Sequence, residues 1–308
     1  MSAIRLALVG LGKIARDQHL PAIAATPGIE LVAVASRSAT LDGVAHFATL
    51  ADLLASGEAI DAVALCTPPQ GRRELAGMAL SAGKHVLLEK PPGATVSELG
   101  PLVAAAQERG RTLFATWHSR FAPAVEPARA FLSEVPPRAV RVTWKEDVRV
   151  WHPGQRWIWE PGGLGVFDPA INALSILTAI LPRPVFITSA GLDFPSNCAA
   201  PIAATLALAD AGGLPVRAEL DFLQTGPQSW DIVVETDRGT LTLAQGGAVL
   251  SLDGQVLSAL PETEYRNIYK HFVELVAAGR SDVDLAPLQL VADAFLLGRR
   301  TLVAPFHE

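Results

Sequence analysis

A glycine-rich turn directly after an apolar run near the N-terminus constrains the fold of this chain more than any other feature. The run Ile4–Val9 is typical of a buried strand, and the letters GLGKIA follow it at positions 10–15. Gly10 would make a tight turn from strand to helix, Gly12 would let the backbone approach a pyrophosphate, and the small Ala15 would let the helix pack closely on the strand. The sequence therefore predicts a dinucleotide-binding turn, with an ordinary strand-loop-helix as the alternative.

The net charge of the chain is negative, so it does not help an anionic cofactor to bind at this turn. The net charge of -6 at pH 7 argues against nucleic acid as a partner. An anionic cofactor must therefore meet local donors. We expect the backbone N–H groups of Lys13 and Ile14 to be among them, because the macrodipole favours an anion at a helix N-terminus.

Length, composition and cysteine content indicate a cytoplasmic protein of two domains. At 308 residues, with 50% hydrophobic and 18% charged residues, the chain can build two cores of ordinary size. No apolar stretch reaches the ~18 residues needed to span a bilayer, and the chain does not begin like a secretory signal, so no membrane partner is expected. Cys66 and Cys198 cannot form a disulfide framework and fit a reducing compartment.

The first third of the chain alternates short apolar runs with helical patterns, which is typical of a doubly wound parallel sheet covered on both faces. The runs expected to form strands are Ile4–Val9, Leu31–Ala35, Ala62–Cys66, Val86–Leu88 and Leu113–Ala115. Helices are expected at Arg72–Ala82 and Val96–Arg109, the second with a capping box of Thr95 and Glu98. We assign residues 1–118 to a Rossmann domain that binds NAD(P) beyond the C-terminal ends of these strands.

From about Arg138 apolar and polar residues alternate, which predicts a largely antiparallel sheet with one open face. We assign residues 119–308 to this α+β domain, which would bind the substrate. Helical patterns at Asp168–Ile180 and Tyr265–Ala278 are expected to cover its inner face. The pattern at Leu285–Arg300 is expected to return toward the first domain, and the open face is a candidate surface for a homodimer.

Several motifs, in the same order along the chain, resemble the glucose-fructose oxidoreductase / inositol dehydrogenase / MocA family. They are the glycine turn, Glu89-Lys90-Pro91, Gly162-Gly163 and the Asp168 that follows. Within this family, the letters WKED at 144–147 and WHPGQRWIWEPGG at 151–163 are similar to the bacterial L-arabinose/D-galactose 1-dehydrogenases. One position departs from the family: many members carry a histidine four residues after the aspartate, where this chain has Asn172.

The residues after the second strand indicate which nicotinamide cofactor is preferred. An NAD site usually has a carboxylate there, about twenty residues after the glycine turn, to hold the ribose 2'-hydroxyl. This chain has Ser36 and Arg37, whose hydroxyl and guanidinium groups can bind a 2'-phosphate. We therefore expect NADP to be preferred over NAD. An exposed loop arginine that NAD tolerates is the alternative.

Other strand ends should line the nicotinamide end of the cofactor. The residues expected there are Cys66, Thr67 and Pro68 after the third strand, Gln70 as a ribose contact, and His118 after the fifth. Cys66 is better explained as a small packing residue than as a nucleophile. A structural histidine is the alternative for His118, which could otherwise contact cofactor and substrate.

Lys90 is the candidate catalytic residue of the first domain. An ammonium beside the reacting carbon can hold the substrate oxygen, stabilise the charge that develops on it and relay its proton. Glu89 could orient the nicotinamide ribose or pair with a neighbouring cation. The alternative for both residues is a surface ion pair of little energetic value.

The tryptophan-rich block predicts a sugar site in the second domain, because sugars need carboxylates and imidazoles for their hydroxyls and aromatic faces for their C–H surface. The candidates are Glu146, Trp151, His152, Trp157 and Trp159. Asp168 and Asn172 lie four residues apart on a predicted helix and can converge on the same ligand. For Asp168, which precedes Pro169, a helix N-cap is the alternative. No cluster has metal-ligand spacing, so no metal is predicted.

Together the residues and the resemblance imply an enzyme that oxidises C1 of an aldopyranose, L-arabinose or D-galactose, to the aldonolactone. Hydride would pass to C4 of the nicotinamide, while the anomeric proton leaves through Lys90, Asp168 and Asn172. Two alternatives stay open, since a fold does not fix a function. One is a dehydrogenase of the same family that acts on an inositol or another sugar carbon. The other is a sugar- or nucleotide-sensing regulator without turnover.

Overall fold

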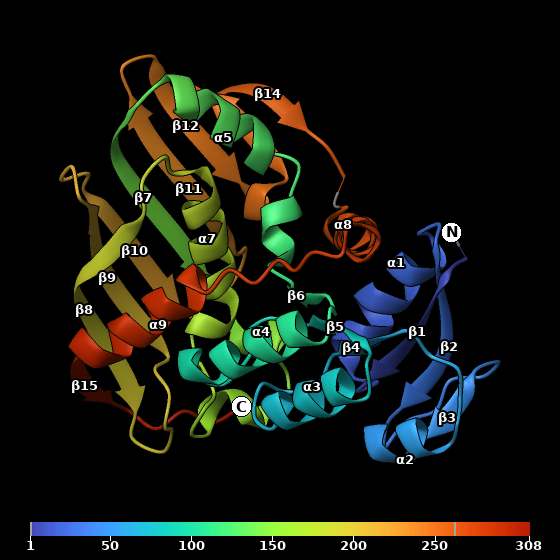
Figure 1. Cartoon of the computed structure of the whole chain (residues 1–308). Helices are drawn as coiled ribbons and strands as arrows, with labels where there is room; N and C mark the ends of the chain where they lie inside the picture. The colour runs from blue at the N-terminus through green and yellow to red at the C-terminus, as the bar shows by residue number, and fades with distance from the viewer. Residues whose placement is uncertain (1, 262) are drawn as a thin grey trace. The chain divides into compact units, whose positions relative to one another are not determined.

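The computed structural model describes residues 2–261 and 263–308, which form two compact units. One unit contains the chain up to His118 and the segment Tyr265–Asp284, and the other contains Ser119–Glu264 and Leu285–Glu308. Figure 1 shows their elements. We describe each unit by itself.

The first unit is built on a six-stranded parallel sheet with the strand order β3-β2-β1-β4-β5-β6, which is the order of a Rossmann fold. Its strands are β1 (Ile4–Val9), β2 (Ile29–Ala35), β3 (Ala45–Phe47), β4 (Ala62–Leu65), β5 (His85–Leu88) and β6 (Leu113–Ala115). Continuous apolar runs such as β4, whose residues are all buried, form strands here because both faces of the sheet are covered. The predicted parallel sheet is confirmed, and the short β3 is the one strand of this sheet that was not predicted.

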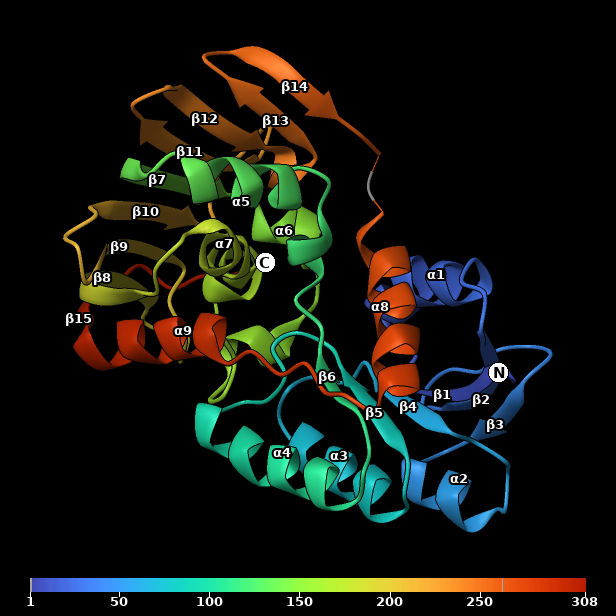
Figure 2. The same ribbon diagram turned by 45° about the horizontal axis from the view of Figure 1, so that its top comes forward.

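Helices lie on both faces of this sheet. They are η1 (Ala15–His19), α1 (Leu20–Ala24), α2 (Leu50–Ala55), α3 (Arg72–Ser81), η2 (Val96–Glu98), α4 (Leu99–Glu108) and α8 (Glu264–Ala278). Figure 2 shows α2, α3 and α4 on one face and α1 and α8 on the other.

The predicted capping box of Thr95 and Glu98 is wrong. The Thr95 hydroxyl donates to the Glu98 carboxylate at 3.1 Å and caps no backbone N–H, because a 3-10 turn begins at this position. A capping box is present at α2, where Thr49 accepts from the Asp52 N–H and Asp52 accepts from the Thr49 N–H.

The second unit is built on a nine-stranded sheet with the order β14-β13-β12-β11-β7-β10-β9-β8-β15. Its strands are β7 (Pro137–Lys145), β8 (Val185–Pro195), β9 (Ala203–Asp210), β10 (Val216–Asp221), β11 (Ser229–Thr236), β12 (Gly239–Ala244), β13 (Val249–Leu252), β14 (Gln255–Ala259) and β15 (Arg299–Val303). All neighbours are antiparallel except β7 with β10 and β8 with β15. The predicted, largely antiparallel sheet is therefore confirmed.

Helices cover one face of this sheet. The helical segments are η3 (His118–Phe121), α5 (Val125–Glu134), α6 (Val148–Trp151), η4 (Arg156–Trp159), α7 (Phe167–Ile180), η5 (Gln245–Gly247) and α9 (Ala286–Leu297). Figure 1 shows α5, α7 and α9 on the same side of the sheet, and α7 contacts β7 and β11 while α9 contacts β8. Among the residues that the structure describes, no helix is long and apolar enough to cross a membrane.

The predicted places of the last two helices are wrong. We expect Tyr265–Ala278 on the second sheet, but α8 belongs to the first unit, where Tyr269 bonds to His19. We expect Leu285–Arg300 at the first domain, but α9 ends at Leu297 and packs on β8 in the second unit. The reason is physical: periodicity shows that a helix has an apolar face, but not which sheet receives it.

Candidate active site

The predicted cofactor residues of the first unit stand where its parallel strands end. Gly10 follows β1, Ser36 and Arg37 follow β2, Cys66, Thr67 and Pro68 follow β4, Glu89 and Lys90 follow β5, and His118 comes shortly after β6. Gln70 is exposed in the loop between β4 and α3. Because the C-terminal ends of parallel strands share one edge of a sheet, this is the edge where a Rossmann fold binds its ligand.

The glycine turn has the geometry that a dinucleotide requires. Gly10 has a φ of 90°, and a Cβ on it would lie 3.0 Å from the backbone nitrogen of Thr67. A Cβ on Gly12 would meet nothing within 4 Å, so the backbone there borders open space. Arg16 N–H donates to the Gly12 carbonyl, so Lys13 and Ile14 form the first helical turn. These residues fit a bound pyrophosphate, and the fully buried Ala15 lets the helix pack against the sheet.

The backbone after β2 is held by β3. Ser36 N–H donates to the Phe47 carbonyl at 2.9 Å, and the Ser36 carbonyl lies 3.0 Å from His46 Nε2. Ser36 is buried and Arg37 is exposed. Position 36 therefore has a fixed backbone, and the next residue carries a solvent-accessible guanidinium.

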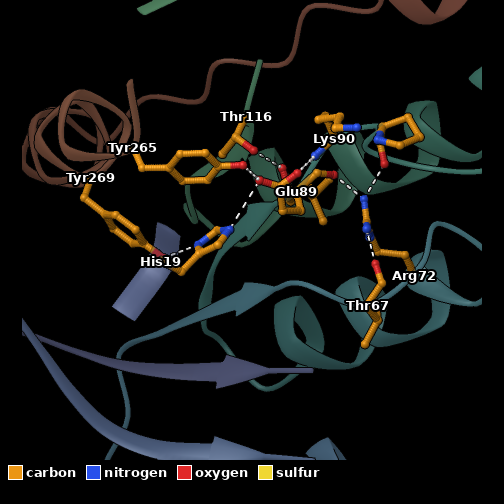
Figure 3. Close-up of polar contacts among 10 residues, drawn as sticks. His19, Thr67, Arg72, Glu89, Lys90, Thr116, Tyr265 and Tyr269 are labelled. Carbon is orange, nitrogen blue, oxygen red and sulfur yellow. Dashed lines mark hydrogen bonds and ion pairs between the residues drawn. The ribbon is translucent and has the colours of Figure 1, made fainter. Parts of the chain in front are cut away.

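The main chain on either side of Lys90 is held by Arg72, which the sequence analysis missed. This buried side chain, from the first turn of α3, donates to the carbonyl oxygens of Thr67, Glu89 and Pro91 (Figure 3). It therefore joins the loops after β4 and β5. A signal existed, because a cation is unfavourable in the first turn of a helix unless another interaction keeps it there.

Glu89 is buried among side chains of the first unit. His19 Nε2 lies 3.3 Å from Glu89 Oε1, and the Tyr265 hydroxyl donates to the same oxygen at 2.7 Å. His118 stacks on Tyr265, with ring centroids 5.2 Å apart. Of the two roles expected for Glu89, the structure contains the pairing with a neighbouring base. The contact with a ribose stays a prediction.

Both members of the His19–Glu89 pair have shifted pKa values that favour charge. Burial raises the pKa of Glu89, but the hydrogen bond and charge of His19 and the charges of His118 and Lys90 outweigh burial and lower it to about 2. Burial lowers the pKa of His19, but Cys66, Tyr269 and Glu89 outweigh burial and raise it well above its ordinary value. The surroundings of this pair, whose carboxylate directly precedes Lys90 in the chain, thus favour the charged form of both groups.

The second unit brings three predicted site residues together. His152 Nε2 lies 2.9 Å from Glu146 Oε1, and His152 Nδ1 lies 3.5 Å from Asp168 Oδ2. Glu146 and Asp168 are both buried, with 2% of their surface exposed. His152 Nε2 is hydrogen-bonded to Glu146, whereas its buried Nδ1 makes no hydrogen bond to any described residue. The remaining lone pairs of the two carboxylates can accept hydrogen bonds from hydroxyl groups.

Asp168 is not the N-cap of its helix, so that alternative is wrong. The N-cap of α7 is Val166, and the Asp168 N–H already donates to the Gly165 carbonyl at 2.9 Å. The turn before it is unusually close, since a Cβ on Gly163 would overlap the carbonyl oxygens of Trp157 and Ile158. The helix begins at Phe167, so Asp168 lies inside its first turn. Asn172 follows one turn later and is partly exposed.

The aromatic side chains predicted for this site differ in exposure and packing. Trp151 is 41% exposed and packs edge-on against Trp230 with centroids 4.7 Å apart. Trp159 packs against Phe222 and Phe306, which favours a core role for it. The sequence analysis missed Trp230, whose indole N–H donates to Glu146 Oε2 at 2.7 Å. Trp230 lies on β11, far from the tryptophan block in sequence, so no local pattern pointed to it.

No group of three or more His, Cys, Asp and Glu side chains with metal-binding geometry occurs among the described residues.

Comparisons with known proteins agree with this geometry. The family model GFO_IDH_MocA, an oxidoreductase family with an NAD-binding Rossmann fold, matches residues 4–116. Galactose 1-dehydrogenase of Pseudomonas fluorescens is 49% identical over 308 residues, which is 100% of both chains.

Solved structures are also similar to this chain. The crystal structure of D-galactose-1-dehydrogenase protein from Rhizobium etli is 60% identical, with a TM-score of 0.96 over 100% of this chain and 99% of that one. KijD10, a 3-ketoreductase from Actinomadura kijaniata solved with NADP and TDP-benzene, is 20% identical with a TM-score of 0.82 over 98% of this chain and 100% of that chain, which shows the fold alone. The resemblance inferred from the motifs is confirmed by the full-length match, and this chain belongs to the GFO_IDH_MocA family of oxidoreductases.

Proposed function

We propose that this protein is an NADP-preferring aldose 1-dehydrogenase that oxidises the anomeric hydroxyl of D-galactose or L-arabinose to the aldonolactone. The observation that carries the proposal is the buried Glu146–His152–Asp168 cluster, in a chain whose full-length relatives are named galactose 1-dehydrogenases. A cluster of this kind suits a ligand with several hydroxyl groups. The ring configuration at C2 to C4 is common to both sugars, so one pocket can accept both.

The residues of the first unit supply the cofactor half of the reaction. A nicotinamide held by this unit would supply the acceptor for the hydride that leaves C1 of the sugar. The turn at Gly10 and Gly12 holds the pyrophosphate, and Ser36 and Arg37 hold the 2'-phosphate that distinguishes NADP from NAD. Lys90 binds the anomeric oxygen and stabilises its developing negative charge.

The residues of the second unit supply the proton acceptor and the recognition of the sugar. Asp168 accepts the anomeric proton, and its carboxylate lies beside His152, with 3.5 Å between Nδ1 and Oδ2. The amide of Asn172 orients the oxygen without taking the proton. Glu146, held by His152 and Trp230, binds a ring hydroxyl, and the exposed Trp151 offers an aromatic face to the C–H surface of the sugar.

A panel of four sugars tests this proposal. D-glucose and D-xylose differ from D-galactose and L-arabinose, respectively, at C4 within the ring. Because a site that binds a hydroxyl leaves its own polar groups unpaired when that hydroxyl is misplaced, we expect kcat/KM to fall on the order of 100-fold for the two C4 epimers. Reduced nicotinamide is followed by absorbance with NADP and with NAD.

Analysis of the product distinguishes the proposed function from its alternatives. Identification of the product by NMR as a lactone supports oxidation at C1, whereas a keto sugar would indicate a sibling dehydrogenase of another carbon. Sugar binding by calorimetry without turnover of any sugar would indicate a sensing protein. Equal kcat/KM for galactose and glucose would show that the C4 hydroxyl is not recognised.

A further inference from the structure

A buried histidine that plays no part in the proposed reaction links three elements of the first unit. His19 lies in η1, the helical segment that follows the glycine turn, and none of its surface is exposed. Its Nδ1 lies 2.7 Å from the Tyr269 hydroxyl on α8, and its Nε2 lies 3.3 Å from Glu89 Oε1 after β5. Figure 3 shows the imidazole between these two partners.

Glu89 connects His19 to the backbone of Lys90. Its Oε1 accepts from the Tyr265 hydroxyl and faces His19, while its Oε2 accepts from the backbone N–H of Lys90 at 2.5 Å. The opposite side of the same peptide is held by Arg72, which binds the Glu89 carbonyl. The peptide between Glu89 and Lys90 is therefore hydrogen-bonded at both its N–H and its carbonyl group. The bond to the N–H depends on the carboxylate of Glu89.

The carboxylate depends in turn on His19. Burial alone disfavours a charged carboxylate, and a buried charge is stable only when it is paired and hydrogen-bonded. The titratable groups that face Glu89 are His19 from η1, Tyr265 from α8, His118 from η3 and Lys90 from its own strand end; Cys66 and Tyr269 face His19. His19 Nε2 lies 3.3 Å from Glu89 Oε1, and the charges of His118 and Lys90 act on the carboxylate in the same direction.

We propose that His19 is a positioning residue: through Glu89 it fixes the peptide of Lys90 and connects the glycine-turn helix to the place where Lys90 acts. The inference rests on the proposed function only in giving Lys90 a catalytic task. Displacement of a catalytic group by about 1 Å can cost ~100-fold in rate, so a side chain that fixes its backbone affects turnover.

Two substitutions separate the two contacts of His19. The amide nitrogen of glutamine reaches the place of Nε2, so His19→Gln keeps a donor for Glu89. The shorter His19→Asn places its amide near Nδ1, which keeps a partner for Tyr269 and removes the His19 contact from Glu89, while the bond from the Tyr265 hydroxyl is unchanged. Tyr269→Phe is the matched control, because it removes the Tyr269 contact from the unchanged histidine.

We expect His19→Gln and Tyr269→Phe to keep kcat within about threefold of wild type, and His19→Asn to lose about tenfold or more in kcat with KM for the sugar nearly unchanged. The loss should grow as the pH falls from 8 to 6. In His19→Asn the burial of Glu89 is compensated less, because only the charges of His118 and Lys90 still lower its pKa, so the pKa of Glu89 rises and a larger fraction of the carboxylate is protonated at low pH. Wild type keeps Glu89 ionised there, since its pKa is about 2.

A readout without turnover completes the test. Hydrogen exchange of the peptide that contains Lys90, followed by mass spectrometry, should be faster in His19→Asn than in wild type and unchanged in His19→Gln and Tyr269→Phe. A wild type that oxidises no sugar would refute the proposed function, and the exchange rates would still decide this inference. Equal kcat, pH profile and exchange in His19→Asn and His19→Gln would overturn it and leave His19 a packing residue.

Discussion

At the residue scale, the most informative side chain is Asp168, which the sequence describes equally well as a helix cap or as a proton acceptor. The structure removes the first alternative, because Val166 precedes α7 as its cap. Asp168 is buried beside His152. Its charge therefore belongs to the polar cluster.

Asp168→Asn tests this assignment with almost no change of shape. We expect kcat to fall by roughly 10²–10⁴-fold, because the amide cannot accept the anomeric proton. The melting temperature and the Kd for NADP should stay close to wild type. Asp147→Asn is the control: Asp147 caps α6 by accepting from the Arg149 N–H at 3.0 Å, and asparagine caps equally well. Near-wild-type kcat in Asp168→Asn would leave Lys90 and solvent as the proton route.

Cofactor preference is also decided by single residues. The double variant Ser36→Asp with Arg37→Ala places a carboxylate where the 2'-phosphate of NADP is expected and removes the guanidinium. Since hydrogen bonds to charged groups are worth ~1.5–3 kcal/mol, the ratio of kcat/KM for NADP to that for NAD should fall by about tenfold or more. Ser38→Asp, in the same exposed loop, should change the ratio less. An unchanged ratio in the double variant would refute the assignment.

At the scale of elements, the turn before α7 determines where Asp168 stands. A Cβ on Gly163 would overlap two backbone carbonyl oxygens, which cannot move aside as a flexible side chain can. We expect Gly163→Ala to cost about 1–3 kcal/mol of unfolding free energy and to lower kcat, because the helix start must shift.

Gly100→Ala is the matched control for this glycine. Gly100 lies exposed in α4, and a Cβ there would meet nothing within 4 Å. Alanine should therefore stabilise the protein by about 0.5–1 kcal/mol and leave kcat unchanged. Urea unfolding of both variants gives the comparison. A Gly163→Ala variant as stable and active as wild type would show that the turn relaxes without displacing Asp168.

At the scale of the whole molecule, the chain is divided between units in a way that local patterns do not reveal. Both α8 and α9 have apolar residues at helical spacing, yet α8 belongs to the Rossmann unit and α9 to the other. The partners of Tyr265 and Tyr269, Glu89 and His19, come from distant parts of the sequence. The residues proposed for the reaction are divided as well, with Lys90 on one unit and Asp168 on the other.

The sequence by itself determined the parallel sheet, the largely antiparallel sheet and the strand ends that carry Gly10, Ser36 and Lys90. These follow from local rules: buried parallel strands need continuous apolar runs, half-covered strands alternate, and ligands of a Rossmann fold lie at the strand ends. It also singled out Glu146 and His152 as candidates, because residue types suited to binding sugars are concentrated in one block, and their role stays a prediction.

Only the tertiary structure decided the contacts between distant segments. The sequence analysis assigned no role to Arg72, His19 or Trp230. The fold places them against the peptide of Lys90, Glu89 and Glu146, respectively. The physical reason is that a buried polar side chain takes its role from the partner that satisfies its hydrogen bonds. The packing of the elements determines which partner that is, and the spacing of residues along the chain does not predict it.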